Sequence, residues 1–312
     1  MNEKIQQIAR LFSGTLNFDE AHKKSETILL SMVEDKDFLF EIIRQNLSEP
    51  SYLNRNRHYP TLAMDVFKND VIDMVINIFP CLPDGRENVS FQSIHHHGSL
   101  KLSTIGLSGP GYRSMIFNDD YTINPKTQET DLRLIANYKN EIGKYTFCDA
   151  YVPHVVFYPK AVSSTLVLWS RSKDSLLNKV KSKVPKKLSR SISPILNKIG
   201  MRKALDLNVA ENHDFFSENG KFYALKERIG YPVGSNDNFI QNCFHYLQSV
   251  GFDDNAFLKS LLKKEFISES AVKWIGKYLN AEVIPPLFEQ IHVDVDYRVN
   301  CLEGEILAAA SE

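Results

Sequence analysis

Apolar positions along the first 80 residues recur at the spacing of helix faces. Three groups show this spacing, and the third group stops at Pro80. We therefore expect residues 1–84 to be an N-terminal helical extension. The groups are Ile5, Ile8 and Phe12, then Phe38, Ile42, Ile43 and Leu47, then Phe67, Val71, Met74, Val75 and Ile78.

The pattern changes between residues 90 and 170, where short stretches rich in β-branched and aromatic residues are broken by turn clusters at 109–111 and 118–120. Strand follows strand without an intervening helix, which predicts a sandwich or a barrel. One further strand is expected at 221–226. Alternation typical of a half-buried strand is clearest at Leu132, Leu134, Ala136 and Tyr138.

Helical spacing returns in the last 80 residues, at 239–247, 257–262 and 275–279. Gly251 is suited to cap the C-terminus of the first of these helices, and Ser268 to cap the N-terminus of the last. The chain is thus expected to be α+β, with a β-barrel at 85–230 and a C-terminal helical extension at 231–312.

Composition excludes several classes of protein. Of the 312 residues, 43% are hydrophobic and 24% are charged, so a disordered or fibrous chain is excluded. The formal charge of −1 gives no reason to expect a nucleic-acid partner. The start of the chain lacks the apolar core of a signal peptide, and no apolar run is long enough to span a membrane. Four scattered cysteines suit a reducing compartment, so we expect a soluble cytoplasmic protein: Cys81, Cys148, Cys243 and Cys301.

The segment 171–203 is strongly basic, with eleven Lys and Arg residues against the single acid Asp174. Its apolar residues keep helical spacing, although Pro185 and Pro194 must break or kink a helix. The first interpretation is a solvated surface helix that covers the barrel. The alternative is a basic amphipathic segment that binds an anionic membrane or an acidic partner.

Three consecutive histidines, His95, His96 and His97, form the most informative motif. In a strand, His95 and His97 would share one face and His96 would lie on the other. Two imidazoles on one face can hold one metal ion, and His154 in a later β-rich stretch is the candidate third ligand. Three neutral imidazoles leave coordination positions open for a substrate and dioxygen, which suits Fe(II) chemistry.

A second interpretation of the same stretch requires no metal. The positions 93, 95, 97, 99, 101 and 103 are all polar, whereas Ile94, Leu100 and Leu102 are apolar. The polar face could be solvated while the apolar face forms the core. A barrel that encloses a polar metal pocket would give the same pattern, so periodicity does not decide between the two.

The spacing of His95, His97 and His154, with the segment HVVFYPKAVSSTLVLWS at 154–170, resembles the cupin superfamily. The resemblance covers residues 88–172 and is greatest to the three-His thiol dioxygenases of the cysteine-dioxygenase type. It implies a double-stranded β-helix barrel, with the three histidines as iron ligands. The exposed sheets of cupins often pair, so the resemblance also implies a possible homodimer.

The sequence departs from that family at several positions. Lys101 stands where many cupins have a glutamate ligand, which restricts a metal site to three histidines. Val167 and Trp169 stand where thiol dioxygenases have their catalytic histidine and tyrosine, and Leu102 replaces the cysteine that forms a crosslink. A substrate of the cysteine type therefore does not follow.

Other residues are candidates for the rest of the pocket. Arg113 or Lys101 could bind an anionic group of the substrate. Tyr158 could assist proton transfer. Cys148 precedes His154 by six residues, and we interpret it as a small buried core residue.

The working hypothesis is a mononuclear non-haem iron dioxygenase that acts on a small polar metabolite. One alternative is a zinc- or nickel-dependent hydrolase, isomerase or lyase on the same histidines. A second alternative is a metal-free binding module that uses segment 171–203. The His292-x-Asp294 pair suggests a 2-oxoglutarate oxygenase, but no histidine follows it to complete that ligand set.

Overall fold

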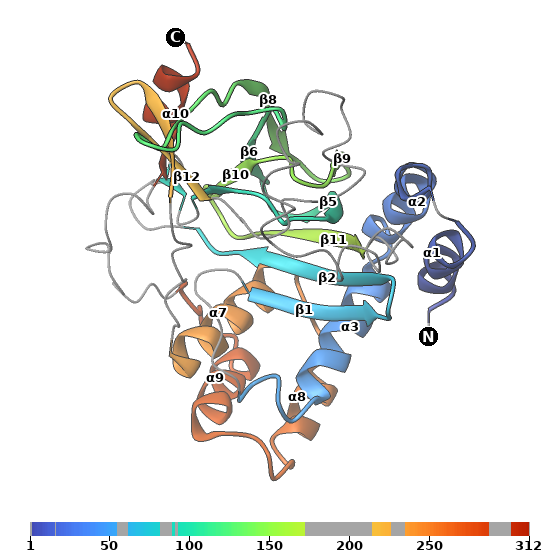
Figure 1. The fold of residues 1–312 in the computed structure, drawn as a ribbon. Helices are drawn as coiled ribbons and strands as arrows, with labels where there is room; N and C mark the ends of the chain where they lie inside the picture. Colours follow the sequence, from blue (N-terminus) through green and yellow to red (C-terminus); the bar gives the residue numbers. More distant parts are fainter. Residues whose placement is uncertain are drawn as a thin grey trace, which may run out of the picture.

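Two antiparallel β-sheets lie one above the other, and helices cover their outer faces (Figure 1). The computed structural model describes residues 2–15, 17–54, 62–81, 89–90, 93–171, 214–225, 235–286 and 301–311. Of the basic segment 171–203, only the backbone of residue 171 falls within these ranges, so both interpretations of that segment concern residues outside them. The His292-x-Asp294 pair also lies outside them.

The five-stranded sheet has the strand order β1-β2-β11-β5-β9. Alternate residues of β2 are fully buried beneath the helices, as the period of two of a strand requires. The strands are β1 (Leu62–Lys68), β2 (Ile72–Phe79), β11 (Ser163–Arg171), β5 (Leu100–Ser108) and β9 (Tyr145–Cys148).

The seven-stranded sheet has the order β7-β13-β12-β4-β10-β6-β8. A separate two-stranded pair joins β14 (Cys301–Leu302) to β3 (Val89–Ser90). The seven strands are β7 (Glu129–Thr130), β13 (Lys221–Ala224), β12 (Asp214–Glu218), β4 (Ile94–His95), β10 (His154–Phe157), β6 (Tyr112–Phe117) and β8 (Leu134–Asn140).

The chain alternates between the two sheets along most of its β region. It passes from β4 to β5 to β6, and later from β8 through β9, β10 and β11 to β12, changing sheet at every step. This alternation winds the chain around a common interior as a double-stranded β-helix. The inner faces of both sheets therefore meet, and side chains from distant segments can converge there.

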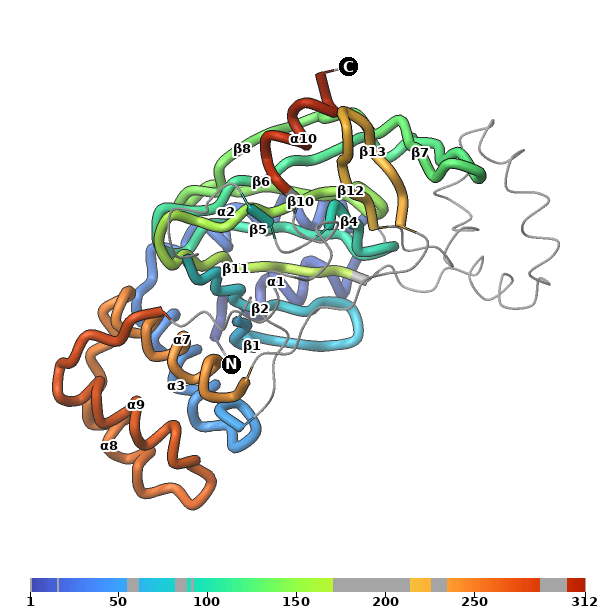
Figure 2. Tube along the Cα trace, turned by 90° about the vertical axis from the view of Figure 1, so that its left-hand side faces the viewer, coloured from blue at the N-terminus to red at the C-terminus, as the bar shows by residue number. Residues whose placement is uncertain are grey.

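Helices cover the outer face of the five-stranded sheet, and α10 covers the other sheet (Figures 1 and 2). Side chains of Asn2, Asn17, Asp35, Ser235, Asp254 and Ser268 cap six of the helices at their N-termini. No helix in the described ranges is long and apolar enough to cross a membrane. The helices are α1 (Glu3–Ser13), α2 (Phe18–Val33), α3 (Lys36–Ser48), α7 (Asn236–Ser249), α8 (Asn255–Leu261), α9 (Glu269–Leu279) and α10 (Glu303–Ala309).

The helical prediction for the third apolar group, residues 67–78, is wrong. These residues belong to β1 and β2, an antiparallel pair that extends the five-stranded sheet. The group satisfied helical spacing because apolar residues occur at both odd and even positions of β2. The even-numbered residues of β2, from Ile72 to Ile78, are the buried ones. Because β1 and β2 are strands, the β structure begins at Leu62 instead of residue 85.

Other sequence predictions are confirmed. The strand expected at 221–226 is β13, and the alternating stretch from Leu134 onward is β8. Helix α7 ends at Ser249, and Gly251 follows with a φ of +67°, in the left-handed region that favours glycine. The hydroxyl of Ser268 accepts from the N–H of Ala271 and caps α9.

The buried side chain of Asn46 joins α3 to the edge strand β1. Its amide nitrogen donates to the carbonyl of Asp65 at 2.8 Å, and its amide oxygen accepts from the Asp65 N–H at 2.8 Å. We expect Asn46→Ala to lower the free energy of unfolding by about 2 kcal/mol, because the two hydrogen bonds that join α3 to β1 are lost. Urea unfolding measures this; an unchanged midpoint would contradict the role of Asn46.

Candidate metal centre

His95 and His154 lie side by side on neighbouring strands of the seven-stranded sheet. They are direct partners in the antiparallel pair β4–β10, so their side chains are on the same face. Their ring centroids are 4.8 Å apart. Both residues are buried, with 2% and 6% of their surface exposed.

His97 reaches the same place from the segment that follows β4. A turn then begins at Gly98, whose φ of +63° is in the left-handed region, and carries the chain into β5 of the opposite sheet. The His97 ring packs edge-on against Trp169 of β11, with centroids 4.5 Å apart. Its Nε2 lies 3.2 Å from the Nε2 of His154.

Backbone carbonyls set the tautomers of two of these histidines. The Nδ1 of His95 is 2.9 Å from the carbonyl of Ser93, and the Nδ1 of His154 is 3.1 Å from that of Val152. A carbonyl oxygen can only accept, so each Nδ1 carries the proton and each Nε2 presents a lone pair. Hydrogen bonds of this kind, from the ring nitrogen that does not bind the ion to a backbone carbonyl, orient histidines as metal ligands.

Near neutral pH, protons do not compete with a metal ion for the imidazole of His154. Burial, followed by the neighbouring His95, lowers the pKa of His154 to about 3. The imidazole is therefore neutral, which is the form that binds a metal ion.

The spacing of the nitrogens fits a single ion. One ring nitrogen from each of His95, His97 and His154 lies within 4.8 Å of the others. Two imidazole nitrogens bound about 2.1 Å from one ion, at tetrahedral or octahedral angles, are separated by roughly 3.0–3.4 Å. The distance of 3.2 Å between His97 and His154 falls in this range.

The sequence suggests one continuous strand through His95, His97 and Lys101, but the structure has a turn within this stretch. The strand β4 ends at His95, and the turn after His97 changes the side to which later odd-numbered residues point. Lys101 and Ser103 consequently face helix α2, not the histidines. The alternative of a solvated histidine face is wrong for His95 and His154, since both are buried.

The middle histidine of the triplet has a separate role. His96 is 4% exposed, and its Nδ1 accepts from the backbone N–H of Gly98 at 3.0 Å. Its ring lies 5.7 Å from that of Tyr151. His96 thus stabilises the turn between the two sheets.

The cationic side chains proposed as substrate anchors face away from the histidines. The strand pairing places Ile116 opposite His154, so Arg113, three residues earlier on β6, lies on the other face. There Arg113 forms an ion pair with Glu303 of α10. Lys101 forms ion pairs with Asp19 of α2 and with Asp149.

Tyr158 is buried just beyond the end of β10, and its backbone N–H donates to the carbonyl of Val89. It follows His154 by four residues, which corresponds to about 13 Å along an extended chain. A role for Tyr158 in proton transfer stays a prediction.

Cys148, interpreted from the sequence as a core residue, and Trp169 also lie beside the histidines. The Cys148 sulfur is 3.7 Å from the Nδ1 of His154, although the two residues are on separate strands. Burial, followed by Asp149, raises the pKa of this thiol to about 12, so it is protonated at neutral pH. The β5 pairings place Cys148 and Trp169 on either side of Leu102, which shows that all three share the inner face.

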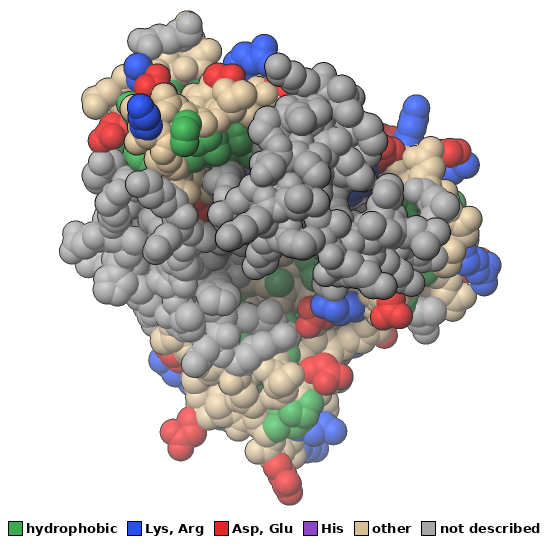
Figure 3. Space-filling model, viewed as in Figure 1, with side chains coloured by type: hydrophobic (Ala, Val, Ile, Leu, Met, Phe, Trp, Pro, Cys, Tyr) green, Lys and Arg blue, Asp and Glu red, His purple; other side chains and the backbone are tan. Residues whose placement is uncertain are grey.

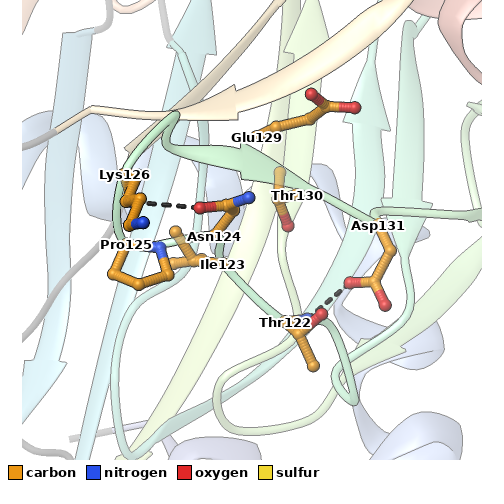
Figure 4. A pocket seen from close by; sticks show the side chains of 8 residues that line it. All are labelled: Thr122, Ile123, Asn124, Pro125, Lys126, Glu129, Thr130 and Asp131. Carbon is orange, nitrogen blue, oxygen red and sulfur yellow. Dashed lines mark hydrogen bonds between the residues drawn. The ribbon is translucent and has the colours of Figure 1, made fainter.

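The rest of the described surface offers a less specific site. An open hollow lies at the hairpin that contains β7, lined by residues 122–126 and 129–131, and no histidine lines it (Figure 4). On the face seen in Figure 3, acidic and basic side chains are interspersed among the described residues. Neither feature brings together groups for catalysis as the histidines do.

No family model and no curated protein matches this chain. Solved structures that resemble it include the DMSP lyase DddQ of Ruegeria pomeroyi, at 12% identity and a TM-score of 0.24, covering 38% of this chain and 49% of that one. An RmlC-like cupin from Desulfovibrio desulfuricans matches at 14% identity and a TM-score of 0.23, covering 35% and 81%. The cupin domain of Schizosaccharomyces pombe Cnp3 matches at 10% identity and a TM-score of 0.27, covering 41% and 74%.

The strand order of this chain itself defines the fold class. It is α+β, with a cupin-like pair of antiparallel sheets whose strands alternate as a double-stranded β-helix. The three histidines on its inner face form a candidate site for a divalent metal.

Proposed function

We propose that His95, His97 and His154 bind one Fe(II) ion and that the protein is an oxygenase that acts on a small polar metabolite. The convergence of three imidazole nitrogens within 4.8 Å carries this proposal. Bound there, the ion would supply open coordination positions for dioxygen and substrate. The protein holds the ligand nitrogens in place through the carbonyls of Ser93 and Val152.

The side chains next to the histidines are mostly apolar. Trp169 packs against His97, and the neighbouring inner-face positions are Leu102, Cys148 and Ile116. His95 and His154 are buried, whereas His97 and Trp169 are half-buried, which leaves one side of the site accessible to a substrate. Because Arg113 and Lys101 face away from the histidines and form ion pairs there, we propose that other groups recognise the substrate.

Nitric oxide tests the proposal before any substrate is known, because it binds Fe(II) at a position open to dioxygen. We expect apoprotein loaded anaerobically with Fe(II) to give a high-spin iron–nitrosyl signal in electron paramagnetic resonance. His154→Ala should give none above that of free iron. Iron-loaded protein that forms no nitrosyl complex would contradict the oxygenase. A positive result would justify measuring oxygen uptake with a panel of polar metabolites.

A zinc- or nickel-dependent hydrolase, isomerase or lyase is the second candidate. Within the described residues, the group within 4.8 Å contains three histidines and no carboxylate or thiol. Three histidines with an open fourth position are also a ligand set of catalytic zinc. Zinc that resists exchange for Fe(II) would favour this candidate.

A further inference from the structure

We propose that Asp214 is a positioning residue of the metal centre, whose negative charge raises the affinity of the three histidines for a divalent cation. This inference rests on the proposed metal site. It begins from the strand pairing, in which Asp214 of β12 is the direct partner of His95 of β4. His95 is in turn the direct partner of His154.

These pairings form one row across three adjacent strands: Asp214, His95 and His154. Direct partners in an antiparallel pair point to the same face, with Cβ atoms about 4.5–5.5 Å apart. The next pair in the register, Phe215 and Ile94, provides a check. Both are fully buried in the apolar cluster that contains Ile306 of α10, on the outer face of the sheet. Asp214 and His95 are therefore on the inner face.

Burial gives this carboxylate its electrostatic influence. Asp214 is 2% exposed, so a negative charge on it would be weakly screened by water. Three neutral imidazoles contribute no charge to balance a dication, whereas an ionised Asp214 next to His95 would contribute one negative charge. Asp214 does not belong to the group of ligand atoms within 4.8 Å of one another, so we propose that it acts on the metal ion without binding it directly.

Metal affinity measures this effect without any assay of activity. We expect Asp214→Asn, which removes the charge and keeps the shape, to weaken Zn(II) and Co(II) binding about 10- to 100-fold. Asp214→Glu, which restores the charge, should bind more tightly than Asp214→Asn. The matched control is Asp120→Asn, because Asp120 is an exposed carboxylate paired with Arg133. Its affinity should equal that of the wild type.

Competition with a chromophoric chelator would give these dissociation constants, and circular dichroism in EDTA would verify the fold of each apoprotein. If Asp214→Asn does not fold, Asp214→Ser provides the comparison, since it also removes the charge and leaves space for water. Wild-type affinity in the folded, uncharged variant would overturn the role of Asp214 while leaving the three-histidine site intact. Failure of the wild type itself to bind either metal would overturn both proposals.

Discussion

Replacement of His154 by alanine should weaken the binding of Zn(II), Co(II) and Fe(II) by at least about 100-fold. Loss of a group that hydrogen-bonds to a ligand lowers metal affinity about 10- to 100-fold, and loss of the ligand itself removes a coordinate bond in addition. The effect is expected to be large because the Nε2 of His154, 3.2 Å from that of His97, completes the convergent set. Titration of the apoprotein against a competing chelator measures it.

The histidine triplet supplies a control for this experiment. His96 is as buried as His95, but its Nδ1 accepts from the N–H of Gly98 and it is not a member of the convergent group. His96→Asn keeps a hydrogen-bond acceptor for that N–H and should retain the wild-type affinity. Equal loss of affinity in His96→Asn and His154→Ala would show that the effect comes from disturbed folding.

A second large effect is expected on stability at acidic pH, through His22 of α2. This side chain is fully buried, with Nδ1 2.7 Å from the hydroxyl of Ser103 and Nε2 2.9 Å from that of Ser170. Burial, followed by the positive charge of Lys101, lowers its pKa to about 4. In the unfolded chain a histidine has a pKa of about 6.5.

The sign of the effect follows from these two pKa values. Between pH 6.5 and 4 the unfolded chain binds a proton at His22 that the folded protein does not, so stability falls as the pH is lowered through this window. From pH 7 to pH 4.5 the loss is about 2.5 kcal/mol. Above pH 6.5 the contribution is fully present and constant.

Urea unfolding of the metal-free protein at pH 7 and at pH 4.5 measures this loss. His22→Gln cannot titrate, so its free energy of unfolding should change less between the two pH values, by about 2.5 kcal/mol. The contribution of His154 is common to both proteins and cancels in the comparison. An identical pH dependence in the wild type and His22→Gln would show that His22 does not cause it.

The sequence predicts which residues could be metal ligands, because that depends on residue type, but it does not predict how they come together. Three histidines in two β-rich stretches are sufficient to predict His95, His97 and His154 as candidate ligands. Their convergence depends on a tight turn at Gly98 and on the pairing of β4 with β10. The register between strands distant in sequence is set by tertiary packing, which periodicity along one segment does not encode.

The same limit applies to other residues near the histidines. The position of Arg113 near the motif suggests a substrate anchor, yet one residue of register decides which face of β6 it occupies. Asp214 gave no signal, because its strand partner His95 lies more than a hundred residues away. In β2, apolar side chains occur at both odd-numbered and even-numbered positions, so the sequence of this strand resembles that of a helix. The structure separates them, because the even-numbered side chains from Ile72 to Ile78 are the buried ones.

The metal content of the protein, purified without affinity tags or chelators, tests the central claim most directly. The matched comparison is the His95→Ala/His154→Ala double variant, prepared in the same way. We predict close to one equivalent of bound metal in the wild type, iron if the oxygenase proposal holds, and none in the variant. Absence of metal from both proteins, even after anaerobic addition of Fe(II), would contradict the metal centre.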